Sequence, residues 1–205
     1  MPAEGRRVGA GRGNTPGMVL VTPLPPRTSM IVLGIDPGTA QTGYGVVSGD
    51  HAMRVNLVEC GVIRTRPRER LSLRLREIHD GVSELIARHR PDILAVEDVF
   101  YAKNVRTTVV LGHARGVILL AGEEAGIEIN EFPPAEVKKA VVGTGVATKE
   151  QVQFMLTRLL RLRSVPSPSD AADGVATALA CLMGARVPHL DRRPRVRGAA
   201  GLGLA

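Results

Sequence analysis

The sequence predicts an α/β fold in which helices cover a mixed sheet. Three short apolar runs follow one another between residues 31 and 64, and helical stripes then alternate with further apolar runs. Closely spaced strands followed by β–α alternation are typical of a mixed sheet with helices packed on it. The chain has 205 residues, of which 44% are hydrophobic and only 2% aromatic. Aliphatic side chains must therefore fill the core, and one domain with tails is the expected organisation.

The first three strands are predicted from their apolar content and from the turns that bound them. Residues 31–36 (IVLGID) form an apolar run that ends in an acid and Pro-Gly, which indicates a buried strand. Residues 43–48 and 55–64 follow as two more strands, with Gly49 and Asp50 as the turn between them. Because the connections are so short, we expect an antiparallel meander.

The rest of the domain is predicted to alternate helices with strands. Apolar residues three and four apart, ended by Pro91, predict the first helix. Thr148 and Ser169 precede two later helices as expected N-caps. The expected helices span 71–88, 107–125, 135–142, 148–161 and 169–185, and the expected strands span 92–96 and 127–132.

The two ends of the chain differ from its middle in composition and charge. Residues 1–29 contain five Gly and five Pro without periodicity, so we expect a disordered extension that is dispensable for activity, with Met30 as the functional start. Residues 186–205 are typical of a basic, flexible tail. The two tails carry +3 and +4, which together equal the formal net charge of +7, so the domain over 30–185 is neutral. A basic tail favours nucleic acid, and a solubility tail fits it equally well.

The number of cysteines and the lengths of the apolar runs indicate where in the cell the protein is expected. Two cysteines, Cys60 and Cys181, exclude a disulfide framework and a CxxC metal site. No apolar run reaches the length of a spanning helix, and no signal-peptide stretch follows the basic N-terminus. We expect a soluble, reduced, cytoplasmic protein with no membrane partner.

Four acids stand at the ends of predicted elements among apolar residues. Asp36 ends the first strand, Glu97 ends the fourth, and Asp170 and Asp173 share one face of the last helix. Ionised carboxylates in apolar surroundings need compensation, which a hard divalent cation such as Mg²⁺ supplies. Two ions held there could activate water and stabilise the leaving oxygen of a phosphodiester.

Each acid also has an ordinary explanation. Asp170 suits a helix start by its charge alone, Asp36 precedes a Pro-Gly turn, and Glu97 could pair with a nearby Arg or Lys. The glycine-rich segment 34–45 is also similar to the Asp-x-Gly-Thr turn of sugar kinases and actin-like ATPases. Those enzymes need a second such domain, for which this chain has no room.

An ordered set of segments resembles the RuvC family of bacterial Holliday-junction resolvases. The segments are IVLGIDPGTAQTGYGVV at 31–47, AVEDVFYAKN at 95–104, LGHARGV at 111–117, VKKAVVGTGVATKEQVQ at 137–153 and SDAADGVATALA at 169–180. The resemblance covers about residues 30–185 and leaves out both tails.

The resemblance implies an RNase H-like fold with a five-stranded mixed sheet flanked by helices. It implies a homodimer that cuts two opposed strands of four-way junction DNA with Mg²⁺, for which Mn²⁺ can substitute, and that leaves 5′-phosphates. The family's four catalytic, metal-binding acids carry over onto Asp36, Glu97, Asp170 and Asp173. The resemblance further implies cooperation with the branch-migration proteins RuvA and RuvB in recombination and repair.

The resemblance also implies residues that contact DNA. The family's junction-probing aromatic carries over onto Phe100, and its DNA-contacting lysines onto Lys138 and Lys149. From the residues themselves, Lys103 and Arg106 join this set, because aromatic and basic side chains together suit unpaired bases and phosphates. Phe100 could instead fill the core, and the basic run at 64–70 suits either phosphate contacts or a solvated loop.

Two other functions fit parts of the sequence. A related RNase H-like nuclease of ribosomal RNA processing would share the opening Asp-x-Gly turn, but VFYAKN and the DAAD helix argue against it. A junction-binding subunit without catalysis would not need all four acids. Two cuts in a symmetric junction imply a two-fold dimer, and the apolar helix at 107–125 is the candidate interface.

Overall fold

The computed structural model describes residues 29–50, 54–98 and 105–184. It confirms the predicted fold class, with a five-stranded mixed sheet flanked by helices. In chain order the elements are β1 (Ser29–Asp36), β2 (Gln41–Asp50), β3 (Val55–Arg64), α1 (Leu71–His89), β4 (Ile93–Glu97), α2 (Val105–Glu124), β5 (Glu128–Phe132), α3 (Pro134–Val142), α4 (Lys149–Leu159) and α5 (Ser169–Leu182).

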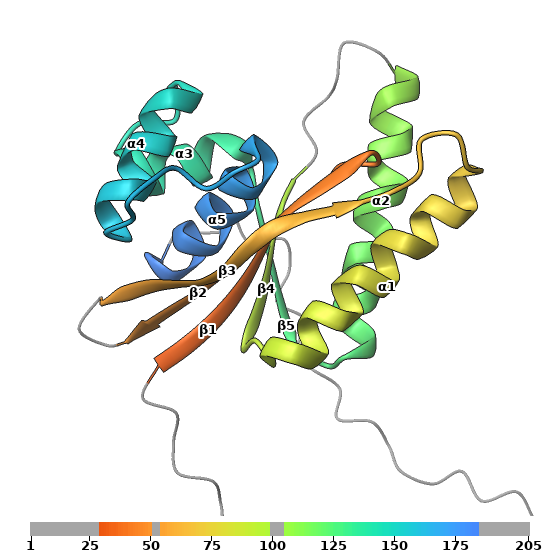
Figure 1. The fold of residues 1–205 in the computed structure, drawn as a ribbon, viewed down its shortest axis with the longest axis horizontal. Coiled ribbons are helices and arrows are strands. Elements are labelled where there is room, and N and C mark those ends of the chain that lie inside the picture. The colour runs from red at the N-terminus through yellow and green to blue at the C-terminus, as the bar shows by residue number, and fades with distance from the viewer. Residues whose placement is uncertain (1–28, 51–53, 99–104, 185–205) are drawn as a thin grey trace, which may run out of the picture.

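The sheet has the order β3-β2-β1-β4-β5 (Figure 1). β1, β2 and β3 pair antiparallel, which confirms the meander. β4 then pairs parallel with β1, and β5 pairs parallel with β4. Because β1, β4 and β5 run in the same direction, their carboxyl ends meet at one edge of the sheet, where ligands of such sheets usually bind.

Helices cover the sheet on both faces. α5 lies against β1 and β2 with α3 and α4 beside it, while α1 and α2 pack together on the other face (Figure 1). The two aliphatic cores match these layers: Val32 and Leu179 belong to the core under α5, and Leu33 and Ile118 belong to the core under α1 and α2. Alternation along each strand therefore decides which side chains face α5.

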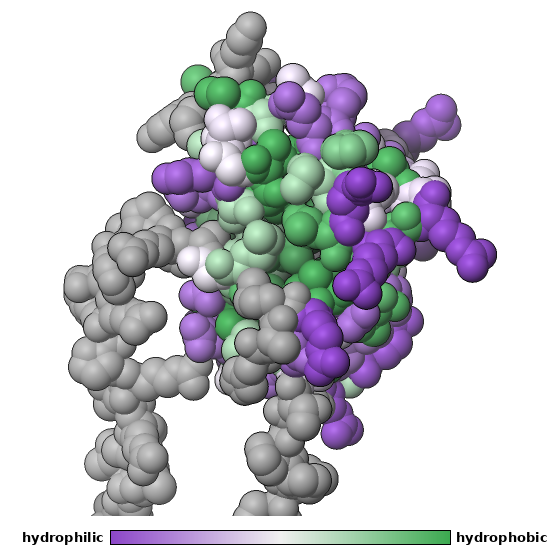
Figure 2. Space-filling view, turned by 90° about the vertical axis from the view of Figure 1, so that its left-hand side faces the viewer, coloured by the Kyte–Doolittle hydropathy of each residue, from purple (hydrophilic) through white to green (hydrophobic). Residues whose placement is uncertain are grey.

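Figure 2 views the molecule from the side on which α3 and α4 lie in Figure 1. Apolar side chains gather near the centre of this face, with hydrophilic residues around them. Exposed hydrophobic residues of this layer include Val146 and Phe154. None of the described helices is long and apolar enough to cross a membrane.

The turn predicted between the second and third strands is wrong. Gly49 and Asp50 belong to β2, where Gly49 pairs with Met30 and with Val55, so the strand pairing extends past them. At the other end of the pair, Ser29 is the first residue of β1 and not part of the N-terminal extension. Residues 1–28 and 185–205 lie outside the described residues, so the predictions for both tails remain predictions.

Helix caps were predicted correctly once and wrongly once. Thr148 caps α4, and together with Gln151 it forms a full capping box. Ser169 is not an N-cap: it is the first residue of α5, which follows Pro168 without any side-chain cap. α4 also ends at Leu159 instead of residue 161, because Arg161 adopts a left-handed backbone conformation.

Candidate metal centre

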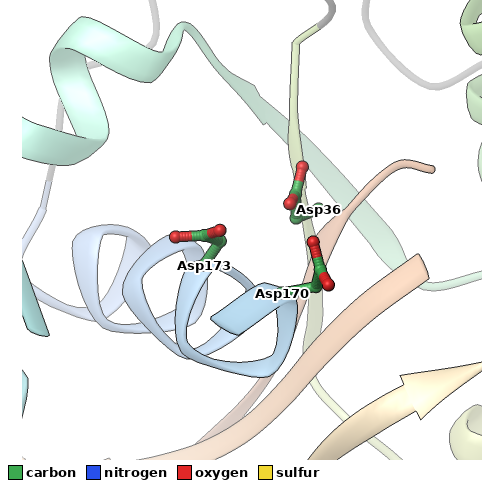
Figure 3. Close-up of side chains that lie close together, drawn as sticks. All are labelled: Asp36, Asp170 and Asp173. Atoms are coloured by element: carbon green, nitrogen blue, oxygen red, sulfur yellow. The ribbon is translucent and has the colours of Figure 1, made fainter. Parts of the chain in front are cut away.

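Three carboxylates converge where β1 ends and α5 begins. One oxygen from each of Asp36, Asp170 and Asp173 lies within 4.8 Å of the others, and all three residues are half-buried. Figure 3 shows Asp36 at the end of β1 and the other two on the first turns of α5. We call these three residues the acidic cluster. The convergence expected from the sequence is therefore present for these three acids.

Glycines bring the helix this close to the sheet. Gly34, Gly43 and Gly45, here called the glycine seat, occupy positions of β1 and β2 whose side chains would face α5. A Cβ on Gly43 would stand 1.9 Å from the Asp170 carbonyl oxygen, and one on Gly34 would stand 2.3 Å from the Gly174 carbonyl oxygen. The backbone of α5 therefore rests directly on the sheet backbone. This contact fixes the distance between α5 and the sheet, and with it the positions of Asp170 and Asp173 relative to Asp36.

Glu97 stands at the end of the neighbouring strand. Ile35 of β1 pairs with Val96 of β4, so Asp36 and Glu97 follow at adjacent strand ends. Asp36 lies an even number of residues from Val32, and Glu97 an even number from Ala95, so both acids are on the sheet face that α5 covers. Glu97 does not meet the spacing that joins the acidic cluster. It faces the cluster from β4 and interacts with it electrostatically.

The surroundings of these acids favour their protonated forms. Burial, followed by the charges of Asp173 and Asp170, raises the pKa of Asp36 to about 7. Burial, followed by the charges of Asp36 and Asp173, raises the pKa of Glu97 to about 8. Burial also raises the pKa of Asp173. Several carboxylates with raised pKa values in one place mark a candidate functional site.

Two lysines offset part of this negative charge. Lys149, the first residue of α4, donates a hydrogen bond of 2.6 Å from Nζ to Oδ2 of Asp173. Burial alone would lower the pKa of Lys149, but this bond and the charges of the cluster raise it. Lys138, on α3, lowers the pKa values of Glu97 and Asp173 by its charge. Both predicted lysines therefore lie beside the acids.

The donor set fits a hard divalent cation. The acidic cluster offers only carboxylate oxygens, which suit Mg²⁺ and Mn²⁺ and not metals that prefer thiolate or imidazole. The mutual repulsion that raises the pKa of Asp36 is the repulsion that a cation between the carboxylates would relieve. Asp36, Asp170 and Asp173 could hold such an ion directly, with Glu97 on its β4 side.

Of the other three residues predicted to contact DNA, the structure describes only Arg106. Phe100 and Lys103 lie outside the described residues. Arg106 is exposed on the first turn of α2, and α2 begins two residues earlier than predicted.

Sequence reasoning missed an ion-pair group that supports β4. Arg115, on α2, contacts Asp98 with 3.4 Å between Nη2 and Oδ1, and also pairs with Glu131 of β5. Asp98 directly follows Glu97, and its amide donates to the Phe132 carbonyl at 2.8 Å. Arg115 lies within the segment LGHARGV, but spacing along the chain does not show that α2 passes over the ends of β4 and β5.

The glycine seat leads to a testable expectation. We expect Gly43→Ala to weaken Mn²⁺ binding at least about tenfold, because the added Cβ displaces the first turn of α5. Titration calorimetry measures the affinity, and thermal melting measures the accompanying loss of stability.

The matched control is Gly49→Ala on the same strand. There a Cβ meets only side chains, the nearest being Leu182 at 3.3 Å. This variant should keep both its metal affinity and its melting temperature. Wild-type Mn²⁺ affinity in a folded Gly43→Ala protein would contradict the positioning role of the seat.

Comparisons with known proteins match most of this chain to one family. A family model described as "Crossover junction endodeoxyribonuclease RuvC" matches residues 32–181. A protein of that name from Desulforamulus reducens is 47% identical over 152 residues, which cover 73% of this chain and 91% of the relative. A solved structure of Thermus thermophilus RuvC superposes with a TM-score of 0.70 at 38% identity, covering 75% of this chain and 94% of that one. A second, described as T. thermophilus RuvC in complex with Holliday junction substrate, gives a TM-score of 0.69 at 35% identity, with the same coverage of both chains.

Proposed function

Because this chain belongs to the RuvC family of crossover junction endodeoxyribonucleases, we propose that it resolves Holliday junctions by paired nicks in two opposed strands during homologous recombination and DNA repair. Its fold is that of the RNase H-like nucleases. The observation that carries the proposal is the acidic cluster, which stands at the sheet edge where this fold binds its ligand. A non-catalytic junction-binding subunit would have no use for the acidic cluster with Glu97 beside it.

We assign the metal and the chemistry as follows. Asp36, Glu97, Asp170 and Asp173 would hold Mg²⁺, for which Mn²⁺ can substitute, with Glu97 on one side of Asp36 and the two helix acids on the other. When bound, such ions lower the pKa of a water nucleophile and neutralise the charge that develops on the phosphate. Because the ions would activate water directly, no covalent protein intermediate is expected.

The lysines have a second role in this proposal. Lys149 donates a hydrogen bond to Asp173, and its side chain is almost half exposed, at 46%. A cation on Asp173 would compete with this hydrogen bond and would leave Lys149 available to the DNA backbone, together with Lys138 of α3, whose charge also acts on Asp173. Phe100 and Lys103, which lie between β4 and α2 in the sequence, and Arg106, on the first turn of α2, complete the proposed DNA-binding set.

A two-fold dimer supplies the second active site. One face of α2 presents Val105, Val109 and Leu120, which are 79%, 52% and 49% exposed. Gly112 and Gly116 continue the same stripe, and a Cβ on either would meet nothing within 4 Å. Small residues along an apolar stripe let two helices approach closely, so we assign this face to the homodimer. Cooperation with RuvA and RuvB belongs to the same proposal.

We expect Val109→Glu to convert the dimer into a monomer, because the new charge would be buried against its symmetry mate. Light scattering at micromolar concentration should give about twice the 21.8 kDa of one chain for the wild type, and about that mass for the variant. A monomeric wild type would contradict the assignment.

The activity itself is tested by substrate comparison. Purified protein with Mg²⁺ should nick four-way junctions at symmetric positions and leave 5′-phosphates, while linear duplexes and structured RNA stay intact. Cleavage of structured RNA in preference to junctions would favour the ribosomal RNA-processing relatives. Binding to junctions without metal-dependent nicking would favour the non-catalytic subunit.

A further inference from the structure

A dense group of arginines follows β3. Residues 64–70, here called the arginine loop, run from the last residue of β3 to the start of α1 and contain four arginines against the single acid Glu69. All four arginines are exposed. The domain as a whole is neutral, so this local excess of positive charge is not shared by the rest of its surface.

Most of this charge is not neutralised within the described chain. Arg66 pairs with Glu77, with 3.4 Å between Nε and Oε1. The side chains of Arg64, Arg68 and Arg70 make no hydrogen bond or ion pair with another residue in 29–50, 54–98 or 105–184. The first turn of α1, which follows, adds no acidic residue. Three extended guanidinium groups are therefore available to a partner of opposite charge.

The loop is fixed to the turn that follows Asp36. The Thr65 amide donates to the Ala40 carbonyl at 3.2 Å, and Thr65 Oγ1 donates to the Thr39 carbonyl at 2.6 Å. Arg74 of α1 donates from Nη2 to the same Thr39 carbonyl at 2.6 Å. These bonds hold the arginine loop at the sheet edge that carries the acidic cluster.

The lateral separation suits a DNA duplex. β3 lies two strands from β1, which places the loop about 10 Å to one side of the cluster. The major groove of a duplex is about 12 Å wide, so long arginine side chains on the loop can reach the backbone across the groove from the strand at the cluster. On the other side of the strand ends lie α3 and α4 with Lys138 and Lys149 (Figure 1), so the acids stand between two cationic groups.

We propose that the arginine loop binds the phosphate backbone of a duplex arm of the junction while the acidic cluster acts on the strand that is cut. The inference rests on the proposed function, because it assigns a contact to the same substrate. Guanidinium groups bind phosphate through paired hydrogen bonds. The loop contains no aromatic residue on which an unpaired base could stack. Its contacts therefore go to the backbone, and they contribute affinity and placement, not sequence readout.

The test replaces three arginines together, Arg64→Gln, Arg68→Gln and Arg70→Gln. Junction affinity is measured over a series of salt concentrations with Ca²⁺ or without divalent ions, so that no cleavage occurs. Each phosphate that the variant no longer neutralises should reduce the log–log salt slope by about 0.9, so a reduction of up to about 2.7 is expected. At about 0.1 M salt the affinity should fall roughly tenfold or more.

The matched control removes the same charge elsewhere. Arg158→Gln, Arg161→Gln and Arg163→Gln change three arginines at and after the far end of α4. Equal losses in both triple variants would overturn the proposal, because they would reflect net charge alone. An unchanged salt slope in the loop variant would overturn it as well.

Cleavage by the same proteins separates this proposal from the proposed function. At saturating protein, the loop variant should nick junctions with Mg²⁺ at a rate within about threefold of the wild type, since the acids are untouched. If the wild type nicks junctions but the loop variant binds them normally, only the loop assignment fails. If the wild type neither binds nor nicks junctions, the proposed function fails.

Discussion

Asp36→Asn abolishes nicking of four-way junctions, with an expected loss of at least about 1,000-fold, while junction affinity changes by less than about threefold. The Asp36 carboxylate lies within 4.8 Å of those of both helix acids. Replacement by an amide removes a negative ligand from the cluster but keeps the shape of the side chain. Single-turnover cleavage of a labelled junction measures the rate, and gel-shift titration measures the affinity.

The stability of this variant shows that the loss is chemical and not structural. The pKa of Asp36 is raised from 3.8 to about 7 in the folded protein, so ionising it destabilises the fold as pH rises from about 4 to about 8. Without metal at about pH 8, Asp36→Asn should therefore melt at a temperature at least a few degrees higher than the wild type. Asp80→Asn, at an exposed position of α1 that pairs with Arg76, is the control and should leave both cleavage and melting unchanged. Retained nicking by a folded Asp36→Asn protein would contradict the assignment.

Metal affinity rises steeply with pH. Cation binding requires the carboxylates to lose their protons, and the pKa values of Asp36 and Glu97 are raised to about 7 and about 8. Between about pH 6.5 and about pH 8.5 the fraction of protein with both groups ionised increases on the order of 100-fold. Mn²⁺ affinity measured by calorimetry should increase by the same order, because the ion binds the ionised form.

The variant Glu97→Gln tests whether these two carboxylates cause the pH dependence of Mn²⁺ affinity. The variant removes the group with the higher pKa, so its remaining pH dependence should level off near pH 7 and its slope below that pH should be halved. A wild-type Mn²⁺ affinity that does not change between about pH 6.5 and about pH 8.5 would contradict the account of the cluster.

Local sequence patterns predicted helices and strands correctly where apolar runs or capping residues alone determine them. Apolar runs located all five strands, and Thr148 was correctly predicted as the N-cap of α4. They failed where tertiary contacts decide. Gly49 and Asp50 look like a turn, but pairing on both sides keeps them in β2. Ser169 looks like a cap, but α5 starts directly after Pro168, where the glycine seat fixes the helix position.

The acids were predictable because Asp36 and Glu97 end strands and Asp170 and Asp173 lie in the first turns of a helix, all of which the sequence pattern implies. The groups that hold them were not. Lys149 reaches Asp173 only because α4 packs beside α5. Arg115 reaches Asp98 and Glu131 only because α2 crosses the ends of two strands. Such contacts join residues 16 to 24 positions apart, and neither periodicity nor motif spacing contains that information.

The most direct test of the central claim is to locate the metal. Crystals of the protein grown at about pH 8 with Mn²⁺ should show anomalous scattering within coordination distance of the carboxylate oxygens of Asp36, Asp170 and Asp173, with Glu97 on the β4 side. The peaks should disappear in the Asp36→Asn protein under the same conditions. Ordered, ionised carboxylates at Asp36, Asp170 and Asp173 with no anomalous peak between them would contradict the account.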